Sequence, residues 1–158
     1  MDSDCVPDFK ERRSTAQIRS SAHKLNIETG RYNNTPHQDR LCDFCTSLVS
    51  SHSSPNPIAV ESEDHFINEC PHGSTIRSSF INRLHSLIPN LSVEASSRAL
   101  VFSGTFPSFL QEFFDSSDAV LLSKAKKDFI RISCRHLHKM YLQTLQLKKD
   151  LQTPAPLG

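Results

Sequence analysis

The sequence has no tryptophan, two tyrosines and almost no excess of charge of either sign. Lys and Arg number 18 and Asp and Glu number 17, so the net charge is +1, which excludes a strongly basic protein that coats nucleic acid. No apolar run approaches the ~18 residues of a membrane span, so we expect no membrane partner. The residues MDSDCVPDFKERR at the N-terminus contain no apolar stretch, so we expect an intracellular protein, nuclear or cytoplasmic, that is not secreted.

Motifs of common enzyme classes are also missing. The chain has no P-loop, no G-x-G-x-x-G fingerprint, no G-x-S-x-G nucleophile elbow and no H-E-x-x-H motif. No nucleophile, base and orienting residue stand out as a set. We therefore do not expect an enzyme.

What the sequence does contain is a helical pattern. Apolar residues recur at three- and four-residue steps over 74–88 and 118–147, which predicts two amphipathic helices. Shorter helices are predicted over 10–25, 93–102 and 107–114. The expected apolar face of the longest helix consists of Leu122, Ala125, Phe129, Ile132, His136 and Met140. These features favour an all-α fold, a small helical domain with a long C-terminal helix.

Two stretches interrupt this pattern. Gly30 is expected to end the first helix, and turn-forming residues follow it as far as Arg40. Residues 46–60, TSLVSSHSSPNPIAV, are rich in Ser and Pro and poor in charge. A flexible loop is therefore expected there.

One pattern of cysteine and histidine carries chemistry. Cys42 and Cys45 form a C-x2-C pair, and His65 and Cys70 complete the pattern C-x2-C-x19-H-x4-C. Zinc accepts thiolate and imidazole ligands together in tetrahedral coordination. With all four positions filled by protein, the pattern predicts one structural Zn²⁺ ion and no open position for a water nucleophile. This zinc knuckle is expected to hold the helical domain together.

Other interpretations of these residues stay open. The cysteines and His65 are alternatively buried, reduced thiols beside an unrelated histidine. If zinc is bound, the second ring nitrogen of His65 is expected to contact one of the nearby acids Glu61, Glu63, Asp64 and Glu69. Cys134, His136 and His138 form a second cluster, for which packing of the long helix is favoured because further ligands are lacking.

Charge is distributed in blocks. Residues 41–120 carry a net charge of −6, and residues 121–158 carry +6. Either the basic parts form a nucleic-acid surface, or they attract the acidic middle within the fold. The expected organisation is a flexible tail (1–9), a basic N-terminal helix and turn (10–40), a zinc knuckle with a Ser/Pro-rich loop (41–72), a helical domain (73–148) and a second flexible tail (149–158).

Three elements around the cysteines resemble the C-terminal region of reverse transcriptases from non-LTR (LINE-type) retrotransposons. SSAHKLNIETGRYN is similar to that family's AH-L-IE-GRY element, RLCDFCTS to its R-C-x-x-C knuckle, and VESEDHFINECP with Arg77 to its ED-x-H-F-x-x-x-C-P element. The matching residues are His23, Leu25, Ile27, Glu28, Gly30, Arg31, Tyr32, Arg40, Cys42, Cys45, Glu63, Asp64, His65, Phe66, Cys70 and Pro71. The loop between Cys45 and His65 is longer than usual for that family, and the catalytic Y-x-D-D element is absent.

The resemblance implies a zinc-bearing accessory module that helps a polymerase domain to hold its RNA template or target DNA. Phosphate contacts are then expected from Arg31, Arg40, Lys124, Lys126, Lys127, Arg131 and Arg135, and base stacking from Tyr32 and Phe44. The alternative is a structural or protein-interaction domain, a detached or vestigial retrotransposon fragment without nucleic-acid binding. The sequence indicates no particular oligomeric state.

Overall fold

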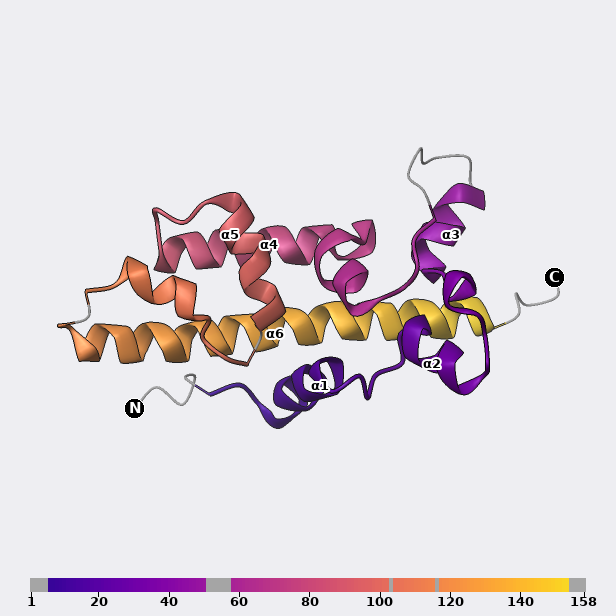
Figure 1. Ribbon diagram of the computed structural model, residues 1–158, viewed down its shortest axis with the longest axis horizontal. Coiled ribbons are helices and arrows are strands. Elements are labelled where there is room, and N and C mark those ends of the chain that lie inside the picture. Colours follow the sequence, from indigo (N-terminus) through magenta and orange to yellow (C-terminus); the bar gives the residue numbers. More distant parts are fainter. Residues whose placement is uncertain (1–5, 51–57, 103, 116, 154–158) are drawn as a thin grey trace.

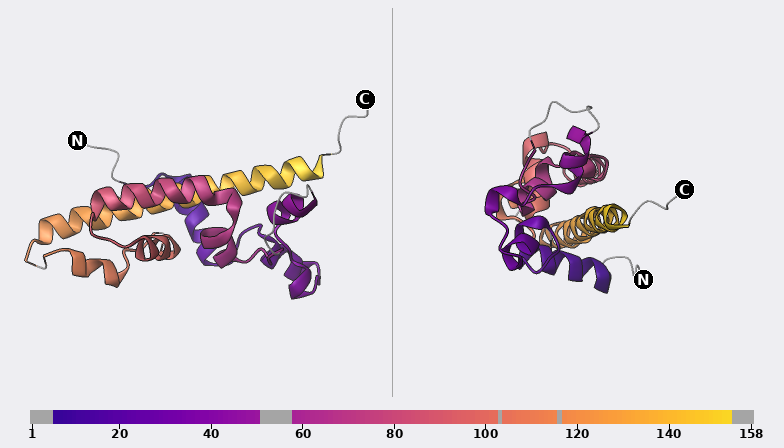
Figure 2. Two further views of the ribbon diagram at one scale, coloured as in Figure 1. Left: turned by 90° about the horizontal axis from the view of Figure 1, so that it is seen from above. Right: turned by 90° about the vertical axis from the view of Figure 1, so that its right-hand side faces the viewer.

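The computed structural model describes residues 6–50, 58–102, 104–115 and 117–153, and this part of the chain contains helices and loops but no strand. The helices lie along one long helix, α6 (Ala119–Gln152), with α4 and α5 on one side and α1 on another (Figure 1, Figure 2). The predicted all-α fold with a long C-terminal helix is confirmed. None of the described helices combines the length and the apolar character needed to cross a membrane.

Helix α6 supplies the surface on which the other helices pack. Asp118 caps its N-terminus by accepting a hydrogen bond from the backbone N–H of Leu121 at 2.9 Å. Its 34 residues extend over about 50 Å. Leu122, predicted on the apolar face, is only partly buried. The rest of that predicted face is buried, as its helical spacing requires: Ala125, Phe129, Ile132, His136 and Met140.

Helices α4 (Ser74–Leu87) and α5 (Val93–Ala99) cover one side of α6. Phe80 of α4 is fully buried. Its ring meets the rings of Phe129 and His136 edge-on, with centroid distances of 6.3 and 5.7 Å. Because edge-to-face ring pairs add to the gain from burial, these contacts fix α4 on α6.

The segments after α4 lie where they are predicted but differ in helix type. Only the first part of the predicted helix 93–102 is α-helical, and the tighter 3₁₀ segment η5 (Leu100–Phe102) completes it. The predicted helix 107–114 is the 3₁₀ segment η6 (Ser108–Phe113). Such tight turns are usual in short connecting pieces.

Helix α1 (Phe9–Arg19) packs on α6 from another side. Its first turn is a capping box, in which the N–H of Glu11 donates to Asp8 at 2.8 Å and the N–H of Asp8 donates to Glu11 at 3.0 Å. Nε of Arg135 on α6 donates to the same Glu11 carboxylate at 3.1 Å. The basic helix α1 therefore lies beside the basic residues of α6.

The structure corrects the predicted end of the first helix. Helix α1 ends at Arg19 rather than at residue 25, and Ser21 then takes a left-handed φ of 54° that reverses the chain. Gly30, predicted to end the helix, lies inside a separate helix, α2 (Asn26–Tyr32). A Cβ atom at Gly30 would lie 2.6 Å from Cγ of Arg40. Glycine is therefore needed for a close approach and not as a helix terminator.

Other predicted boundaries also shift. The segment 46–60, predicted as a flexible loop, begins inside helix α3 (Asp43–Ser50), while residues 51–57 lie outside the described part of the chain. Helix α1 begins within the predicted tail 1–9, and α6 extends into the predicted tail 149–158. The division into 10–40, 41–72 and 73–148 stays a prediction.

Candidate metal centre

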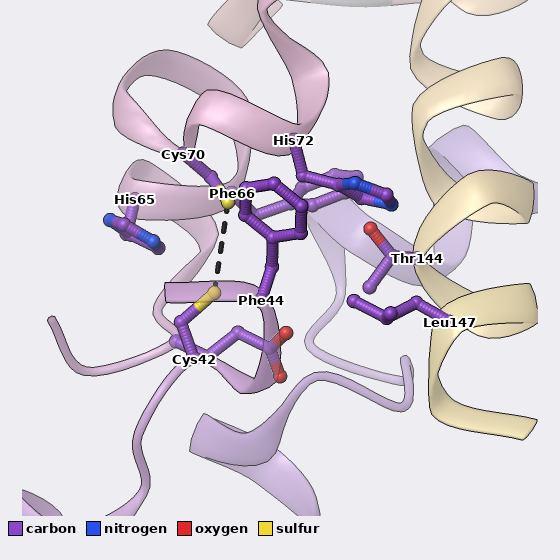
Figure 3. Close-up of a pocket in the computed structure, with 9 residues that line it drawn as sticks. Cys42, Phe44, His65, Phe66, Cys70, His72, Thr144 and Leu147 are labelled. Atoms are coloured by element: carbon purple, nitrogen blue, oxygen red, sulfur yellow. Dashed lines mark hydrogen bonds between the residues drawn. The ribbon is translucent and has the colours of Figure 1, made fainter. Parts of the chain in front are cut away.

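The side chains of the four predicted ligands meet at one place. Figure 3 shows Cys42, His65 and Cys70 there. Cys42, Cys45, His65 and Cys70 are all buried, and their ligand atoms lie within 4.8 Å of one another. Sγ of Cys42 lies 3.6 Å from Sγ of Cys70, and Sγ of Cys45 lies 3.5 Å from Nε2 of His65. A tetrahedral zinc site with bonds of about 2.0–2.3 Å has edges of about 3.5–3.8 Å. All three cysteines are free, and the 3.6 Å between Cys42 and Cys70 is far longer than the S–S bond of about 2.05 Å in a disulfide.

Backbone pairing closes the long gap between the two halves of the ligand set. An isolated antiparallel bridge joins Leu41 to Val60, and the N–H of Cys42 donates to the carbonyl of Ala59 at 2.8 Å. Cys45 follows in the first turn of α3. The bridge therefore brings the C-x2-C pair beside the H-x4-C pair, and we call residues 41–50 and 58–70 together the metal-binding segment.

A wide helical turn brings the second pair of ligands together. Segment η3 (His65–Glu69) is a π-helical turn, in which the N–H of Cys70 donates to the carbonyl of His65 at 2.7 Å. An α-helix would place residues five positions apart on different faces, whereas the wider π turn returns them to one side. Nδ1 of His65 lies 3.3 Å from Oε2 of Glu69, which leaves Nε2 facing Cys45. Of the acids predicted for this role, Glu69 makes the contact.

Burial keeps protons on two of the thiols. The hydrogen bond with Cys70, together with burial, raises the pKa of Cys42 to about 12. Burial and the nearby Cys42 raise the pKa of Cys45 to about 11, and the hydrogen bond from Cys42 lowers the pKa of Cys70. At neutral pH a divalent ion must therefore displace protons from Cys42 and Cys45, so its binding weakens as the pH falls.

A small cavity lies beside the ligands. Its volume is about 10 Å³, and it is lined among others by Cys42, His65 and Cys70 but not by Cys45. This is about the space that a single water molecule occupies. The ring of Phe44, a predicted base-stacking residue, packs on the ring of His72 beside the cavity, with centroids 4.5 Å apart. The site is closed, as is typical of structural metal sites.

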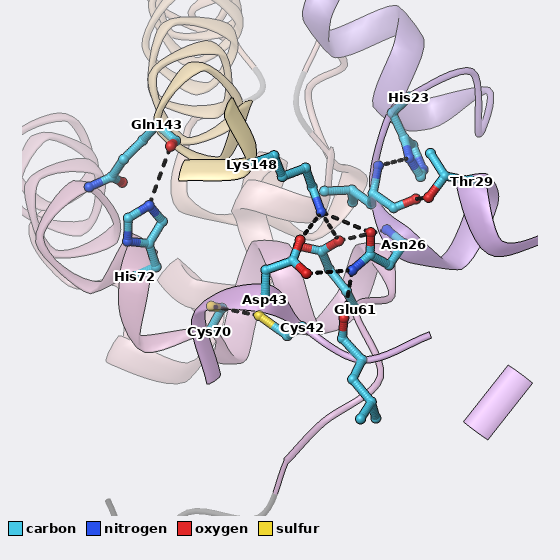
Figure 4. A network of polar contacts seen from close by, with 12 residues as sticks. His23, Asn26, Thr29, Cys42, Asp43, Glu61, Cys70, His72, Gln143 and Lys148 are labelled. Carbon is cyan, nitrogen blue, oxygen red and sulfur yellow. Dashed lines mark hydrogen bonds and ion pairs between the residues drawn. The ribbon is translucent and has the colours of Figure 1, made fainter. Parts of the chain in front are cut away.

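A largely buried cation joins the metal-binding segment to the end of α6 (Figure 4). Nζ of Lys148 donates to Asp43 and to Glu61, each at 2.6 Å, and to Oδ1 of Asn26 at 3.0 Å. Glu61 also accepts a hydrogen bond from the backbone N–H of Asn26 at 2.6 Å. Because Asp43 lies inside the C-x2-C pair, this Lys148 network connects α2, the metal-binding segment and α6.

The sequence signals the ligands clearly but the Lys148 network only indirectly. Its members come from segments far apart in the chain, and no motif pairs any of them with Lys148. The available signal is the opposite charge of residues 41–120 and 121–158. Lys148 with Asp43 and Glu61 supports the interpretation that the basic end attracts the acidic middle.

Four basic residues predicted to contact nucleic acid share one face of α6. Their spacing of three or four positions places them there, and we call them the basic stripe: Lys124, Lys127, Arg131 and Arg135. Two of the guanidinium groups also contact acids, Asp128 at 3.3 Å and Glu11 at 3.1 Å. Lys126 lies on a different face, where Nζ is 6.0 Å from the ring centroid of Phe106.

The predicted nucleic-acid residues of α2 and its following turn differ in exposure. Tyr32 is 76% exposed, and the exposed guanidinium of Arg31 lies 5.8 Å from its ring centroid. Arg40 instead donates from Nε to the carbonyl of Thr35 and from Nη1 to the carbonyl of Ile27, each at 2.9 Å. The guanidinium of Arg40 therefore serves the fold.

The second cluster of cysteine and histidine does not converge. Nδ1 of His136 donates to the carbonyl of Ile132 at 2.6 Å, and Nδ1 of His138 lies 2.7 Å from Oγ of Ser14. Cys134 is buried in the packed helix. Within the described residues, the group around Cys42 is the only one with metal-binding spacing. The prediction that the cluster on α6 serves packing agrees with these contacts.

Comparisons of the chain with protein-family models, curated proteins and solved structures find no match. The resemblance to a retrotransposon reverse transcriptase therefore stays a prediction. The case for a metal centre is made by the geometry of the four side chains.

Lys148→Met should destabilise the fold strongly. It leaves the side chain of Glu61, which is 4% exposed, without its cation. Removing one partner of a buried ion pair costs about 3–5 kcal/mol. Lys149→Met is the matched control, since Lys149 is exposed and a surface substitution changes stability by about 0.5 kcal/mol or less. Chemical denaturation at saturating zinc measures both, and equal stabilities would contradict the role given to Lys148.

Proposed function

We propose that Cys42, Cys45, His65 and Cys70 bind one structural Zn²⁺ ion, and that the chain is a zinc-binding accessory module that helps to bind an RNA template or target DNA. In this proposal the chain resembles the C-terminal region of a non-LTR retrotransposon reverse transcriptase and has no polymerase activity of its own. The observation that carries the proposal is the buried group of three thiols and one imidazole within 4.8 Å.

Zinc fits this donor set better than other common metals. Mg²⁺ and Ca²⁺ prefer oxygen ligands, whereas a mixed set of thiolates and imidazole is typical of zinc. The four side chains are buried, and the cavity beside them, of about 10 Å³, is too small for a substrate. The ion would therefore act structurally, by joining the two halves of the metal-binding segment and adding free energy to a modest core.

The basic stripe on α6 supports nucleic-acid binding. Its four side chains extend along about 16 Å of helix, which suits contacts with successive phosphates. Neutralising phosphates releases counterions, and this release drives binding at low salt. The exposed ring of Tyr32, with Arg31 beside it, offers a second contact, since unpaired bases stack on such rings.

The proposal assigns no catalytic activity to the chain. An ion with four protein ligands has no open position at which to activate water or bind a substrate. The proposal also places the chain in the nucleus or cytoplasm, where thiols stay reduced and nucleic acids are present.

A structural or protein-interaction domain is the second candidate. At the start of α6, Val120 is 82% exposed and Leu121 is 49% exposed. Neighbouring exposed apolar side chains of this kind favour docking on a protein. The partner that the resemblance implies is the polymerase domain of a reverse transcriptase.

Zinc should raise the melting temperature of the metal-free chain. The ion stabilises the fold because it binds the folded state in preference to the unfolded one. Cys45→Ser should abolish this rise. Cys134→Ser, which changes a buried thiol outside the ligand set, is the control and should keep it. Thermal unfolding followed by circular dichroism measures the effect, and a full zinc response in Cys45→Ser would refute the ligand set.

Lys127→Glu should weaken binding to single-stranded RNA and to duplex DNA. The slope of log Kobs against log salt should become shallower by about one, because a phosphate contact is lost. Lys126→Glu is the matched control, since it changes the charge of the adjacent residue on another face of α6. Titrations at several salt concentrations test this. If the zinc-loaded wild type shows no salt-dependent binding, the protein-interaction candidate takes precedence.

A further inference from the structure

A guanidinium group from α4 lies against the metal-binding segment. Arg77 is in the first turns of α4, and its Nη2 donates to the carbonyl oxygen of Cys70 at 2.6 Å. Its other terminal nitrogen, Nη1, is buried and has no hydrogen-bond partner among the described residues. Because unpaired buried donors are rare, this atom points to an interaction with a charged group nearby.

The chain leaves space specifically for this group. Gly73 has a φ of −90°, which any residue adopts, so its backbone conformation does not require glycine. A Cβ atom there would lie 2.9 Å from Nη1 of Arg77 and 2.8 Å from Cε of Met140. Glycine at this position therefore allows the guanidinium to pack beside the ligand loop. Guanidinium groups stay protonated in proteins, so a half-buried positive charge lies here.

A metal centre at this site would have the negative charge that Arg77 needs as a partner. Three thiolates, one neutral imidazole and a divalent ion together carry a net charge of −1. All four ligands are buried, so solvent screens this charge poorly. Lys148 already forms ion pairs with Asp43 and Glu61, so it is not the counter-charge of the thiolates. The electrostatic attraction between Cys70 and Arg77 favours the charged forms of both groups, although burial lowers the pKa of Arg77.

We infer that Arg77 is the counter-cation of the metal centre and that it favours binding of a divalent ion by three thiolates and one histidine. The inference rests on the proposed metal site and adds a residue outside the ligand set. Arg77 contacts no metal in this scheme and acts through Cys70, so it is a positioning residue.

Two substitutions separate charge from hydrogen bonding. Arg77→Gln keeps an amide donor for the carbonyl of Cys70 but removes the charge, whereas Arg77→Lys keeps the charge. Arg83→Gln is the matched control, because Arg83 is an exposed arginine on the same helix. Zinc affinity is measured by competition with a chromophoric chelator, and Co²⁺ absorption reports whether the thiolates still bind the ion.

The full chain with Arg77→Gln should bind zinc about tenfold to 100-fold more weakly than the wild type, as is typical when a supporting residue of a metal site is lost. Its Co²⁺ spectrum should keep the thiolate charge-transfer bands. Arg77→Lys should retain most of the affinity, and Arg83→Gln should retain all of it.

Each contrary outcome has a distinct meaning. Unchanged affinity in Arg77→Gln would overturn the role of Arg77, and so would an equal loss in Arg77→Gln and Arg77→Lys, because that result indicates hydrogen-bond geometry rather than charge. Wild-type chain without thiolate bands in Co²⁺ would overturn the metal site itself. The failure of this inference is therefore distinguishable from failure of the proposed function.

Discussion

Three sulfur atoms and one imidazole nitrogen lie within 4.8 Å of one another in the interior, and this close approach determines how α3 is held against the segment that carries His65 and Cys70. Helix α3 has Cys45 as its buried residue and so adds little apolar surface to the core. Burial and mutual contact raise the pKa of Cys42 and of Cys45. A divalent cation bonded to both sulfur atoms would stabilise their thiolate forms. It would also fix α3 against the π turn that carries His65.

Two cations lie beside the buried thiols and acids of the metal-binding segment. Lys148 balances Asp43 and Glu61 on the side of α6, and Arg77 approaches Cys70 from α4. Helices α4 and α6 thus each provide one cation to the metal-binding segment. The apolar contacts between α4 and α6, such as Phe80 on Phe129, provide the rigid base for both cations.

The parts of the structure that the sequence predicts correctly are those encoded by local spacing. The long amphipathic helix follows from its three- and four-residue period, and the convergence of three cysteines and His65 follows from the C-x2-C and H-x4-C pairs. Features set by distant contacts are not visible in the sequence. Glycine is typical of a helix end, yet Gly30 lies inside α2, where its missing side chain allows the close approach of Arg40. Helix α3 has a Ser-rich sequence typical of a loop, yet its first turn is held by ligand and ion-pair contacts.

The metal content of the purified chain tests the central claim most directly. Elemental analysis after gel filtration in chelator-free buffer would determine which metal is bound and in what ratio. The account predicts about one zinc ion per chain in the folded wild type and none in Cys42→Ser. A folded, helical wild-type chain that contains no zinc and takes up none from solution would contradict it.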